Sequence, residues 1–397
     1  MKNLPSMILA ASLLILLLHP TCFADTFTHR QTNEVLHGYA TDQTEGLKTF
    51  VQTQEKGMVT LNLAAWDITS NRLGRNNKVI ILTLDNEIML DIETIALEQA
   101  IAEAANEGPL FILLEIDTPG GRTDFAQRIC AAITQRQNRQ IIAFIKGGKY
   151  AGALSSGAAI ALACDKIYMA NNTTIGAAAG ITFSKIGQPQ DLKQAFGEIV
   201  SEKFTSAWRA YFASLAERNN RPGLLARAMV DKDIEVIEVQ QDQKRLFIQP
   251  VNKTAQQKIV HTWSKKGSLL TLTADEAVQS GIADQVINSQ REVLQHLKAT
   301  EAEIIINDNV QKAAMEFQRA KLRFNKLKKS LDLKVKQSRN QQTKPRALRL
   351  LRGIRNDYKN LIKLAKNYPD LHTDVELLQW RLNSVEAMYQ KAKMPSR

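Results

Sequence analysis

The sequence predicts an α/β domain built around a parallel sheet, followed by an all-α, strongly basic C-terminal region. Two observations predict it. Between residues 79 and 169, short and nearly all-apolar runs alternate with segments whose apolar residues recur at helical spacing. Strands of a parallel sheet are buried on both faces, and the helices that connect them cover the sheet. Beyond residue 290, Lys, Arg, Gln, Leu and Ala dominate and Gly353 is the one glycine, a composition typical of long helices.

The apolar runs and the periodic segments place the first elements in order. Strands are expected at residues 79–84, 110–116, 141–145 and 167–169, where the runs are short and β-branched residues are frequent. Helices are expected between them, at 91–106, 122–136 and 154–163. The first of these helices carries Ile92, Ile95 and Ala100 on one face, and the second carries Phe125, Ile129 and Ile133.

The rest of the chain is expected to change character twice. It should be helical from about 195 to 230 and β-rich from 234 to 250, and the run 269–273 should lead into a helix at 274–280. In the region 290–397, helices should stop before proline, within 341–345 and 367–370. We expect this region to be a coiled-coil-like module, so that a chain ending near Ser289 stays folded and active.

The first 24 residues have the features of a secretory signal. Lys2 gives a positive start, Met7 to Leu18 form a short apolar segment, and Cys22-Phe23-Ala24 resembles a cleavage site. The apolar segment is shorter than the roughly 20 residues that a membrane span needs. We therefore predict a signal peptide over 1–24 and a secreted or periplasmic mature chain, with membrane association through an uncleaved anchor as the alternative. Residues 25–77 are polar without a clear period and are expected to be an N-terminal extension.

Positive charge is concentrated at the C-terminal end. The whole chain has a formal net charge of +12, yet all of the excess lies beyond residue 290. In a protein outside the cytoplasm, an anionic membrane or an envelope polymer is a better partner for this charge than nucleic acid. A solvated helical face is the alternative.

The cysteines do not indicate a metal or cofactor site. Cys130 and Cys164 stand among small and apolar residues, and neither has metal-ligand spacing. A disulfide between them in an oxidising compartment stays open. No cofactor and no metal are expected.

Two adjacent serines stand at the start of the third predicted helix, in KYAGALSSGAAIALA. The first turn of a helix offers unpaired backbone N–H groups, so the hydroxyl of Ser155 could become a nucleophile while the N–H of Ser156 holds an oxyanion. A second glycine-rich turn, Asp117-Thr118-Pro119-Gly120-Gly121, should lie at the same edge of the sheet. The alternative is that both serines cap the helix.

Several blocks resemble a known family. LEIDTPGGR at 114–122, the small residues around Ser155, IYMA at 167–170 and TTIGAA at 173–178 follow one another as in ClpP-class serine peptidases of the ClpP/crotonase fold, and most like the NfeD group of membrane-associated proteases. The resemblance extends from about Val79 to Val286. It implies a ClpP/crotonase-fold serine protease domain over 78–289, acting as an endopeptidase on peptides or on apolar segments of membrane proteins. It also implies a homo-oligomer.

The same resemblance assigns roles to residues. In the family pattern A-x-S-x-G, Ala153, Ser155 and Gly157 match, so Ser155 is the nucleophile and Ser156 donates its N–H to the oxyanion. Gly121 becomes the second oxyanion donor, and Lys203, in the segment KFTSAW, becomes the general base. A lysine can act as a base only where burial favours its neutral form, and we expect Phe204, Ala207 and Trp208 to bury Lys203.

Histidine usage supports a Ser/Lys dyad independently. The five histidines beyond the signal segment all lie outside the matching blocks, so a Ser-His-Asp triad would need a residue from an extension or an insertion. Leu154, before the serine, departs from the small residue that is usual in the family. The transmembrane helices and the C-terminal barrel of full-length NfeD proteins are not seen in the sequence. Two alternatives remain, an inactive scaffold that binds partners through its helical tail and a crotonase-type acyl-CoA enzyme.

Overall fold

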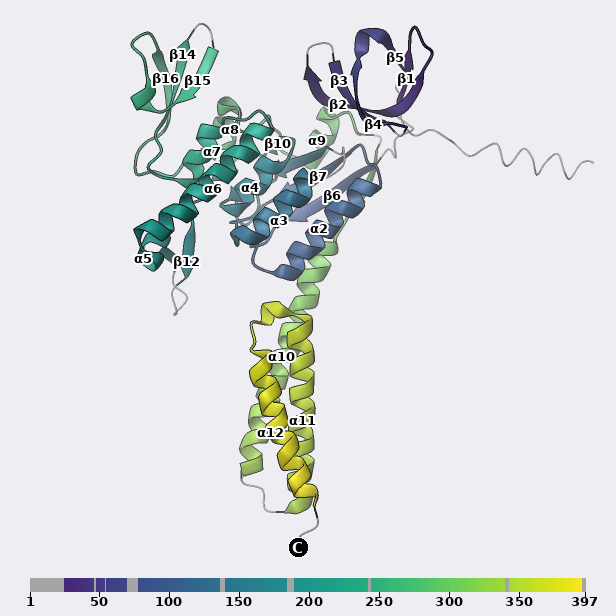
Figure 1. Ribbon diagram of the computed structural model, residues 1–397, viewed down its shortest axis with the longest axis vertical. Helices are drawn as coiled ribbons and strands as arrows, with labels where there is room; N and C mark the ends of the chain where they lie inside the picture. The colour runs from purple at the N-terminus through teal and green to yellow at the C-terminus, as the bar shows by residue number, and fades with distance from the viewer. Residues whose placement is uncertain are drawn as a thin grey trace, which may run out of the picture.

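The computed structural model describes residues 25–45, 48–53, 55–69, 78–135, 140–183, 189–241, 244–300, 302–339 and 343–394. A central α/β unit carries a small β-sheet unit at its N-terminal end, a three-stranded sheet on an extension, and a long helical bundle that projects away from the sheet (Figure 1). The predicted signal peptide, residues 1–24, lies outside the described residues. No helix in the described part of the chain is both long and apolar enough to cross a bilayer.

The central sheet is parallel, as the sequence predicted, and has six strands, of which β18 and β19 were not predicted. Their order is β18-β10-β8-β7-β6-β19, and the strands are β6 (Lys78–Leu84), β7 (Phe111–Ile116), β8 (Ile141–Ile145), β10 (Lys166–Met169), β18 (Gln285–Val286) and β19 (Glu303–Ile306). One face packs on the helices α2 (Asp91–Asn106), α3 (Thr123–Thr134) and α4 (Ser156–Ala163). The other face packs on α9 (Gln290–His296) through Val293 and Leu294. The strands are nearly all-apolar because both faces are covered.

A second, smaller sheet holds the start of α4. It has the order β17-β11-β9 and consists of β9 (Gly152–Leu154), β11 (Thr174–Gly176) and β17 (Thr271–Thr273), the last of which leads into α8 (Ala274–Ser280). The expected helix over 154–163 therefore begins two residues later, after a short strand. The chain between β11 and β17 contains a hairpin, β12 (Ile181–Phe183) and β13 (Pro189–Asp191), and the helices α5 (Leu192–Phe196), α6 (Glu198–Arg218) and α7 (Gly223–Val230).

The β-rich segment after α7 forms a separate three-stranded sheet. Its strands are β14 (Val236–Gln241), β15 (Lys244–Ile248) and β16 (Lys258–Ser264), with a 3₁₀ turn (Pro250–Asn252) before the last. The carboxylate of Glu238, almost fully buried, accepts hydrogen bonds from Arg245 and from the indole N–H of Trp263. The strand β16 was not predicted, because its polar composition hides an antiparallel strand with one solvated face.

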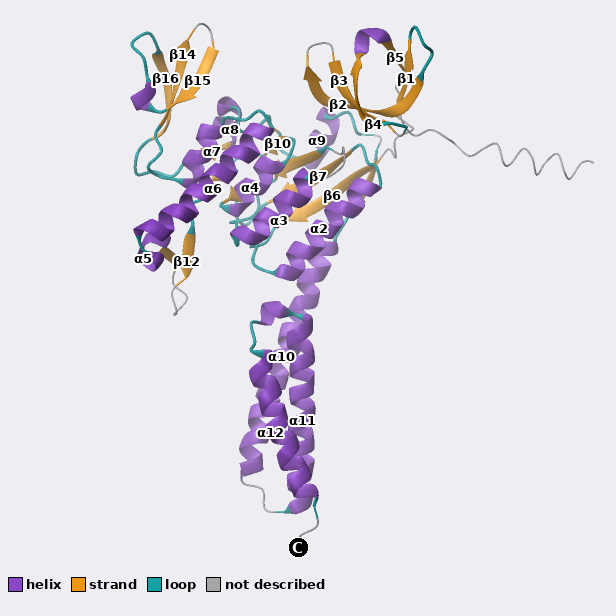
Figure 2. Ribbon diagram, in the orientation of Figure 1, coloured by secondary structure: helices purple, strands orange, loops and turns teal. Residues whose placement is uncertain are grey.

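Residues 25–69 form a five-stranded antiparallel sheet rather than an irregular extension (Figure 2). The order is β4-β3-β2-β1-β5, with β1 (Asp25–His29), β2 (Val35–Glu45), β3 (Lys48–Thr53), β4 (Gly57–Asn62), a 3₁₀ turn (Leu63–Ala65) and β5 (Trp66–Thr69). Five buried side chains make its own small core: Phe27, Leu36, Val51, Leu61 and Trp66.

The C-terminal helices form a three-helix bundle, confirming the all-α prediction. They are α10 (Asn309–Arg339), α11 (Lys344–Asn367) and α12 (Val375–Lys393), with a 3₁₀ turn (Pro369–Leu371) between the last two. The breaks fall where proline was expected to stop the helices. Apolar side chains of all three helices share one core, around Phe324, Tyr358 and Leu382.

Residues beyond the predicted boundary at 289/290 pack with the α/β unit. The strand β19 pairs in parallel with β6, so that Ile304 lies opposite Val79, and Val310 at the start of α10 belongs to the main core. The α9 side chains also cover one face of the sheet. The α/β unit therefore continues through residue 306, and only the helices after it form the bundle.

Candidate functional site

Ser155 occupies a strained turn between β9 and α4. Its backbone has φ 53° and ψ −124°, a conformation that side-chain-bearing residues rarely adopt. The Ser155 N–H donates to the carbonyl of Gly176 at 2.8 Å, which holds the turn against β11. A sharp strand-to-helix turn presents its serine Oγ at the edge of the sheet, as nucleophilic serines require. Such strain persists only where the surrounding structure enforces it.

Helix capping does not explain the serine pair. Ser155 stands at the N-cap position of α4, yet its side chain makes no capping hydrogen bond in the described structure. Ser156 is fully buried, and its Oγ donates to the carbonyl of Gly121 at 2.9 Å. The second serine therefore ties the Ser155 turn to the glycine-rich loop, a contact that the sequence did not predict.

The glycine-rich loop lies directly against Ser155. A Cβ on Gly120, whose φ is +94°, would come within 2.5 Å of the Ser155 Cβ. A Cβ on Gly121 would come within 2.3 Å of the Ile88 carbonyl oxygen. Both positions therefore require glycine, because any side chain would push the loop away from the serine.

Backbone hydrogen bonds fix the glycine-rich loop and the strand β9 in register. Thr118 N–H donates to the Gly152 carbonyl at 2.8 Å, and Leu154 N–H donates to the Thr118 carbonyl at 3.0 Å. The carboxylate of Asp117, which is buried, accepts from the N–H groups of Tyr150 and Gly152 at 3.1 and 3.2 Å. The two predicted turns thus meet at one edge, as expected for neighbouring parallel strands.

Two backbone N–H groups, those of Ser156 and Gly121, have no backbone partner among the described residues. Ser156 is the first residue of α4, where an N–H has no partner within the helix. The Gly121 N–H makes no backbone hydrogen bond among the described residues. The positive end of α4 adds to their effect on a developing negative charge.

Lys203 lies on the exposed side of α6. Its side chain is exposed, and no hydrogen bond joins it to Ser155 within the described residues. The burial expected from Phe204 and Ala207 is not formed, since both are exposed, while Trp208 is buried and donates its indole N–H to the Ala178 carbonyl at 3.2 Å. A single chain therefore brings Ser155, Ser156 and Gly121 together, whereas Lys203 remains exposed to solvent.

The surface around Lys203 is unusually apolar. Ile199 is 75% exposed and Phe204 is 58% exposed on the same helix, and the rings of Phe204 and Phe196 lie 6.4 Å apart. Ile181 on β12 and Val200 are exposed as well. Figure 1 shows α5 and β12 at the end of α6 that points away from the central sheet. Exposed apolar clusters of this kind mark surfaces that another molecule covers.

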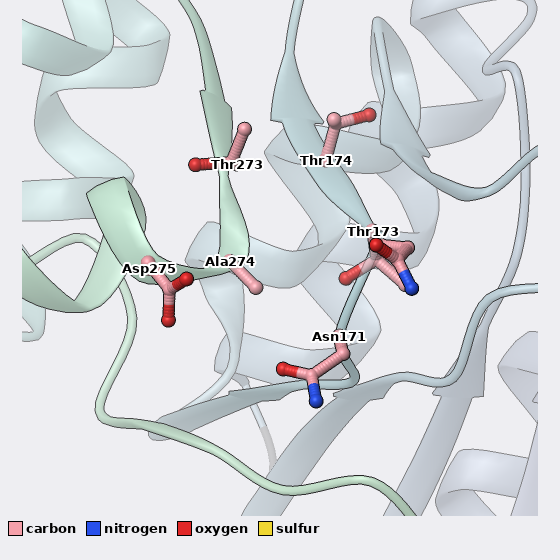
Figure 3. A pocket seen from close by; sticks show the side chains of 7 residues that line it. Asn171, Thr173, Thr174, Thr273, Ala274 and Asp275 are labelled. Atoms are coloured by element: carbon pink, nitrogen blue, oxygen red, sulfur yellow. The ribbon is translucent and has the colours of Figure 1, made fainter.

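One hollow of the described surface lies away from this site. About 670 Å³ in volume, it lies at the start of β11 and is lined by Asn171, Asn172, Thr173, Thr174, Thr273, Ala274 and Asp275 (Figure 3). None of the four predicted residues lines it. Several of its polar groups already have partners, since Thr173 donates to the Ala170 carbonyl and Thr273 caps α8. Position beside a strained serine is the better guide to chemistry than volume.

Three histidines and both described cysteines lie in other contacts, away from the Ser155 turn. His37 bonds to Glu55, His261 packs on Trp263, and His296 packs on Tyr168. Cys130 and Cys164 are both buried and are not joined by a disulfide, and burial raises the pKa of the Cys130 thiol. No cluster of His, Cys, Asp and Glu among the described residues could hold a metal ion.

Comparisons with known proteins connect this geometry to a family. Residues 78–258 match the family model described as NfeD1b, N-terminal domain. The chain is 30% identical over 208 residues to the membrane protein NfeD1b of Bacillus subtilis, covering 52% of this chain and 38% of that protein. It is 33% identical over 141 residues to the membrane-bound protease PH1510 of Pyrococcus horikoshii, covering 35% of this chain and 30% of that protein. The chain thus spans well under half the length of either relative.

A solved structure is also similar. It is an alanine variant of the 1510-N membrane-bound stomatin-specific protease in complex with a substrate peptide, with a TM-score of 0.43 and 23% identity over 58% of this chain and 92% of that one. The resemblance predicted from the ordered motifs is confirmed by the sequence matches. Residues 78–258 form an NfeD1b N-terminal domain, homologous to the membrane-bound protease PH1510.

Proposed function

We propose that the protein is a serine endopeptidase that cleaves peptide bonds through a Ser155/Lys203 dyad. The observation that carries the proposal is the strained Ser155 turn, which sits against two glycines and two free backbone donors. An acyl-CoA enzyme of the same fold needs the donors but has no use for a strained serine between them. The relationship to a protein named as a protease supports the same choice.

The proposed chemistry uses the groups as follows. The Ser155 Oγ attacks the scissile carbonyl carbon while the neutral Lys203 amine takes the hydroxyl proton. The carbonyl oxygen becomes negative and accepts hydrogen bonds from the N–H groups of Gly121 and Ser156. Lys203 then gives its proton to the leaving amine. A water molecule, deprotonated by the same amine, hydrolyses the acyl-enzyme and restores Ser155.

This scheme requires Lys203 to leave water, and we propose that a second copy of the chain covers it. The apolar side chains that surround Lys203 would be buried in such a homo-oligomer, and their burial would favour the neutral amine. The substrate class suggested by the apolar character of this region is a peptide with an apolar segment.

We further propose that the mature protein works outside the cytoplasm and contacts an anionic membrane through α10. Met315, Leu322 and Leu333 are exposed at spacings of 7 and 11 residues, which places them on one side of the helix. Arg319, Lys326 and Lys329 lie between them and are exposed too. We call these six residues the α10 stripe. Exposed apolar residues interleaved with basic ones are typical of helices that lie at a lipid surface. The two curated relatives are named as membrane proteins.

The test is labelling of Ser155 by a fluorophosphonate together with cleavage of a peptide library, with the assembly state measured by sedimentation. We expect Ser155→Ala to abolish both signals and Lys203→Ala to reduce cleavage by at least a hundredfold. Ser156→Ala should reduce cleavage about tenfold, because the Gly121 carbonyl loses its buried donor while both N–H groups remain. Ile199→Glu should lower the assembly state and the labelling together.

The alternatives predict other outcomes. An inactive scaffold would show no labelling of the wild-type chain in any assembly state. Cleavage that persists in Lys203→Ala would remove the dyad while leaving Ser155 as the nucleophile. Hydrolysis of acyl-CoA thioesters that does not depend on Ser155 would favour the crotonase-type enzyme.

A further inference from the structure

The helix α2 lacks a cap of its own. Leu90 stands at its N-cap position, and a leucine side chain has no acceptor for the unpaired N–H groups of the first turn. The acceptor comes from 279 residues farther along the chain. Asp370, in the turn between α11 and α12, accepts from the Asp91 N–H with Oδ1 at 3.0 Å and from the Ile92 N–H with Oδ2 at 3.2 Å. The Asp370 side chain is buried, with 9% of the residue exposed.

The bundle holds the segment before α2 from both sides. The helix α10 packs along α2. The Gln311 side-chain amide donates to the carbonyl of Thr83, near the end of β6, at 3.5 Å. Asp370 binds at the other end of the segment, at Asp91. Residues 84–90 are therefore fixed between two contacts that both come from the C-terminal helices.

Residues 84–90 are also hydrogen-bonded to the glycine-rich loop. Ile88 N–H donates to the Gly120 carbonyl at 2.9 Å, and Arg122 N–H donates to the Ile88 carbonyl at 2.9 Å. The Thr118 hydroxyl donates to the Asn86 carbonyl at 2.6 Å. The Ile88 backbone and the Ser155 turn thus hold Gly120 and Gly121 between them, without room for a side chain.

We propose that Asp370 is a positioning residue for the Ser155 site: by capping α2 it fixes residues 84–90 and, through Ile88, the orientation of the Gly121 N–H. The proposal rests on the proposed peptidase function for its effect on rate, but not for its structural content. A displacement of the Gly121 N–H weakens hydrogen bonds to the tetrahedral intermediate more than contacts with the bound substrate. Loss of Asp370 therefore lowers kcat and leaves KM nearly unchanged.

The experiment compares Asp370→Ala and Asp370→Asn with Asp374→Ala in the full chain. Asp374 is the matched control, because it caps α12 by accepting from the Leu377 N–H at 2.8 Å and is not hydrogen-bonded to α2 among the described residues. Amide hydrogen exchange is followed for the segments 85–94 and 117–123, with thermal unfolding of every variant measured alongside. Peptide cleavage gives kcat and KM.

We expect Asp370→Ala to speed exchange about tenfold in both segments, in keeping with the loss of one helix cap. It should lower kcat by a similar factor. Asp370→Asn keeps an acceptor oxygen and should recover part of both effects. Asp374→Ala should leave both segments and kcat as in the wild type, even where it lowers the unfolding temperature of the bundle.

Two results overturn the proposal. One is faster exchange confined to 91–94, with 117–123 unchanged. The other is an equal effect from Asp374→Ala, which would indicate general loosening of the bundle. Hydrogen exchange does not depend on catalytic activity. A wild-type chain that cleaves no peptide would therefore contradict the proposed function, while the exchange rates of residues 117–123 in Asp370→Ala would still test whether Asp370 positions the glycine-rich loop. Should Asp370→Ala not fold, the Asn variant carries the same comparison.

Discussion

The pKa of Glu93 is sensitive to the contact between the bundle and α2. It lies in the first turn of α2, partly buried, and burial is the main reason that its pKa is raised to about 7, with the negative charges of Asp370 and Asp85 adding to the effect. The ordinary value is 4.5, so between pH 4.5 and 7 the folded state binds more protons than the unfolded state does. The free energy of unfolding must therefore fall as the pH rises across this window and level off above it.

Glu93→Gln should remove this pH dependence. Glutamine keeps the shape of the side chain and has no proton to lose, so we expect the variant to be about 1–2 kcal/mol more stable than the wild type above pH 7, a figure reduced for solvent screening. The two proteins should have similar stability near pH 4.5. Urea unfolding at several pH values measures this. Glu103→Gln, on an exposed position of the same helix, is the control and should leave the pH profile unchanged.

At the scale of residues, sequence patterns could predict what depends on local chemistry. The pair Ser155 and Ser156, the glycines of the 117–121 turn and the apolar faces of α2 and α3 all follow from residue type and spacing. The bond from the Ser156 hydroxyl to Gly121 and the cap from Asp370 could not be predicted. Both join residues far apart in the chain, and no local period marks them.

At the scale of elements, β19 pairs with the central sheet and α9 packs on one of its faces, although both lie in the basic region beyond residue 289. A chain ending after Ser289 loses Val293, Leu294 and Val310 from the two main cores, and β6 becomes an unpaired edge. Each of the three side chains contributes about 1.5–3 kcal/mol of burial, and together they approach the whole stability of a typical domain. We expect this chain to be insoluble or unfolded by circular dichroism.

A chain ending after Lys312 is the matched comparison. It keeps β19, α9 and Val310 and lacks only the bundle, so it should retain the secondary structure of the α/β unit. If the chain ending after Ser289 is folded and as stable as the longer one, β19 makes no contribution to the sheet. The strand β19 escaped prediction because the average composition of the whole region beyond residue 290 indicates helices, although Ile304–Ile306 are three consecutive β-branched residues, which favour a strand.

The N-terminal sheet escaped prediction for a related reason. Its strands bury one face only around Phe27, Val51 and Trp66, and the other side chains are polar. Without continuous apolar runs, the alternation is weak over strands of 4–6 residues, the length of all but one of them. In contrast, the four central strands β6, β7, β8 and β10 are mostly buried and stand out in the sequence.

At the scale of the whole molecule, two of the exposed surfaces formed by the described residues bear on the proposed function. The apolar surface around Lys203 lies at the outer end of α6, and the α10 stripe lies on the bundle (Figure 1). They differ in chemistry, since the first surrounds one lysine with apolar side chains and the second alternates basic and apolar residues. The first suits a second copy of the chain, and the second suits a charged interface.

The α10 stripe should bind anionic vesicles in a salt-dependent manner. We expect cosedimentation of the protein with vesicles of phosphatidylglycerol and phosphatidylcholine, falling steeply between 0.05 and 0.5 M salt, because the Debye length shortens from roughly 14 Å to 4 Å. Lys326→Glu should weaken binding about tenfold, because it replaces attraction near the surface by repulsion. Leu322→Ser should weaken it as well, through loss of apolar contact with the acyl chains.

Lys328→Glu is the matched control for Lys326→Glu. It makes the same change of charge on the same helix, two residues away and therefore about 160° around the axis, so it faces away from the stripe. If both variants lose binding equally, the attraction comes from the net charge of the bundle and no oriented surface exists. If neutral vesicles bind as well as anionic ones, the basic residues play no part. Only a loss with Lys326→Glu and Leu322→Ser that Lys328→Glu does not share fits a helix lying on the membrane by this one side.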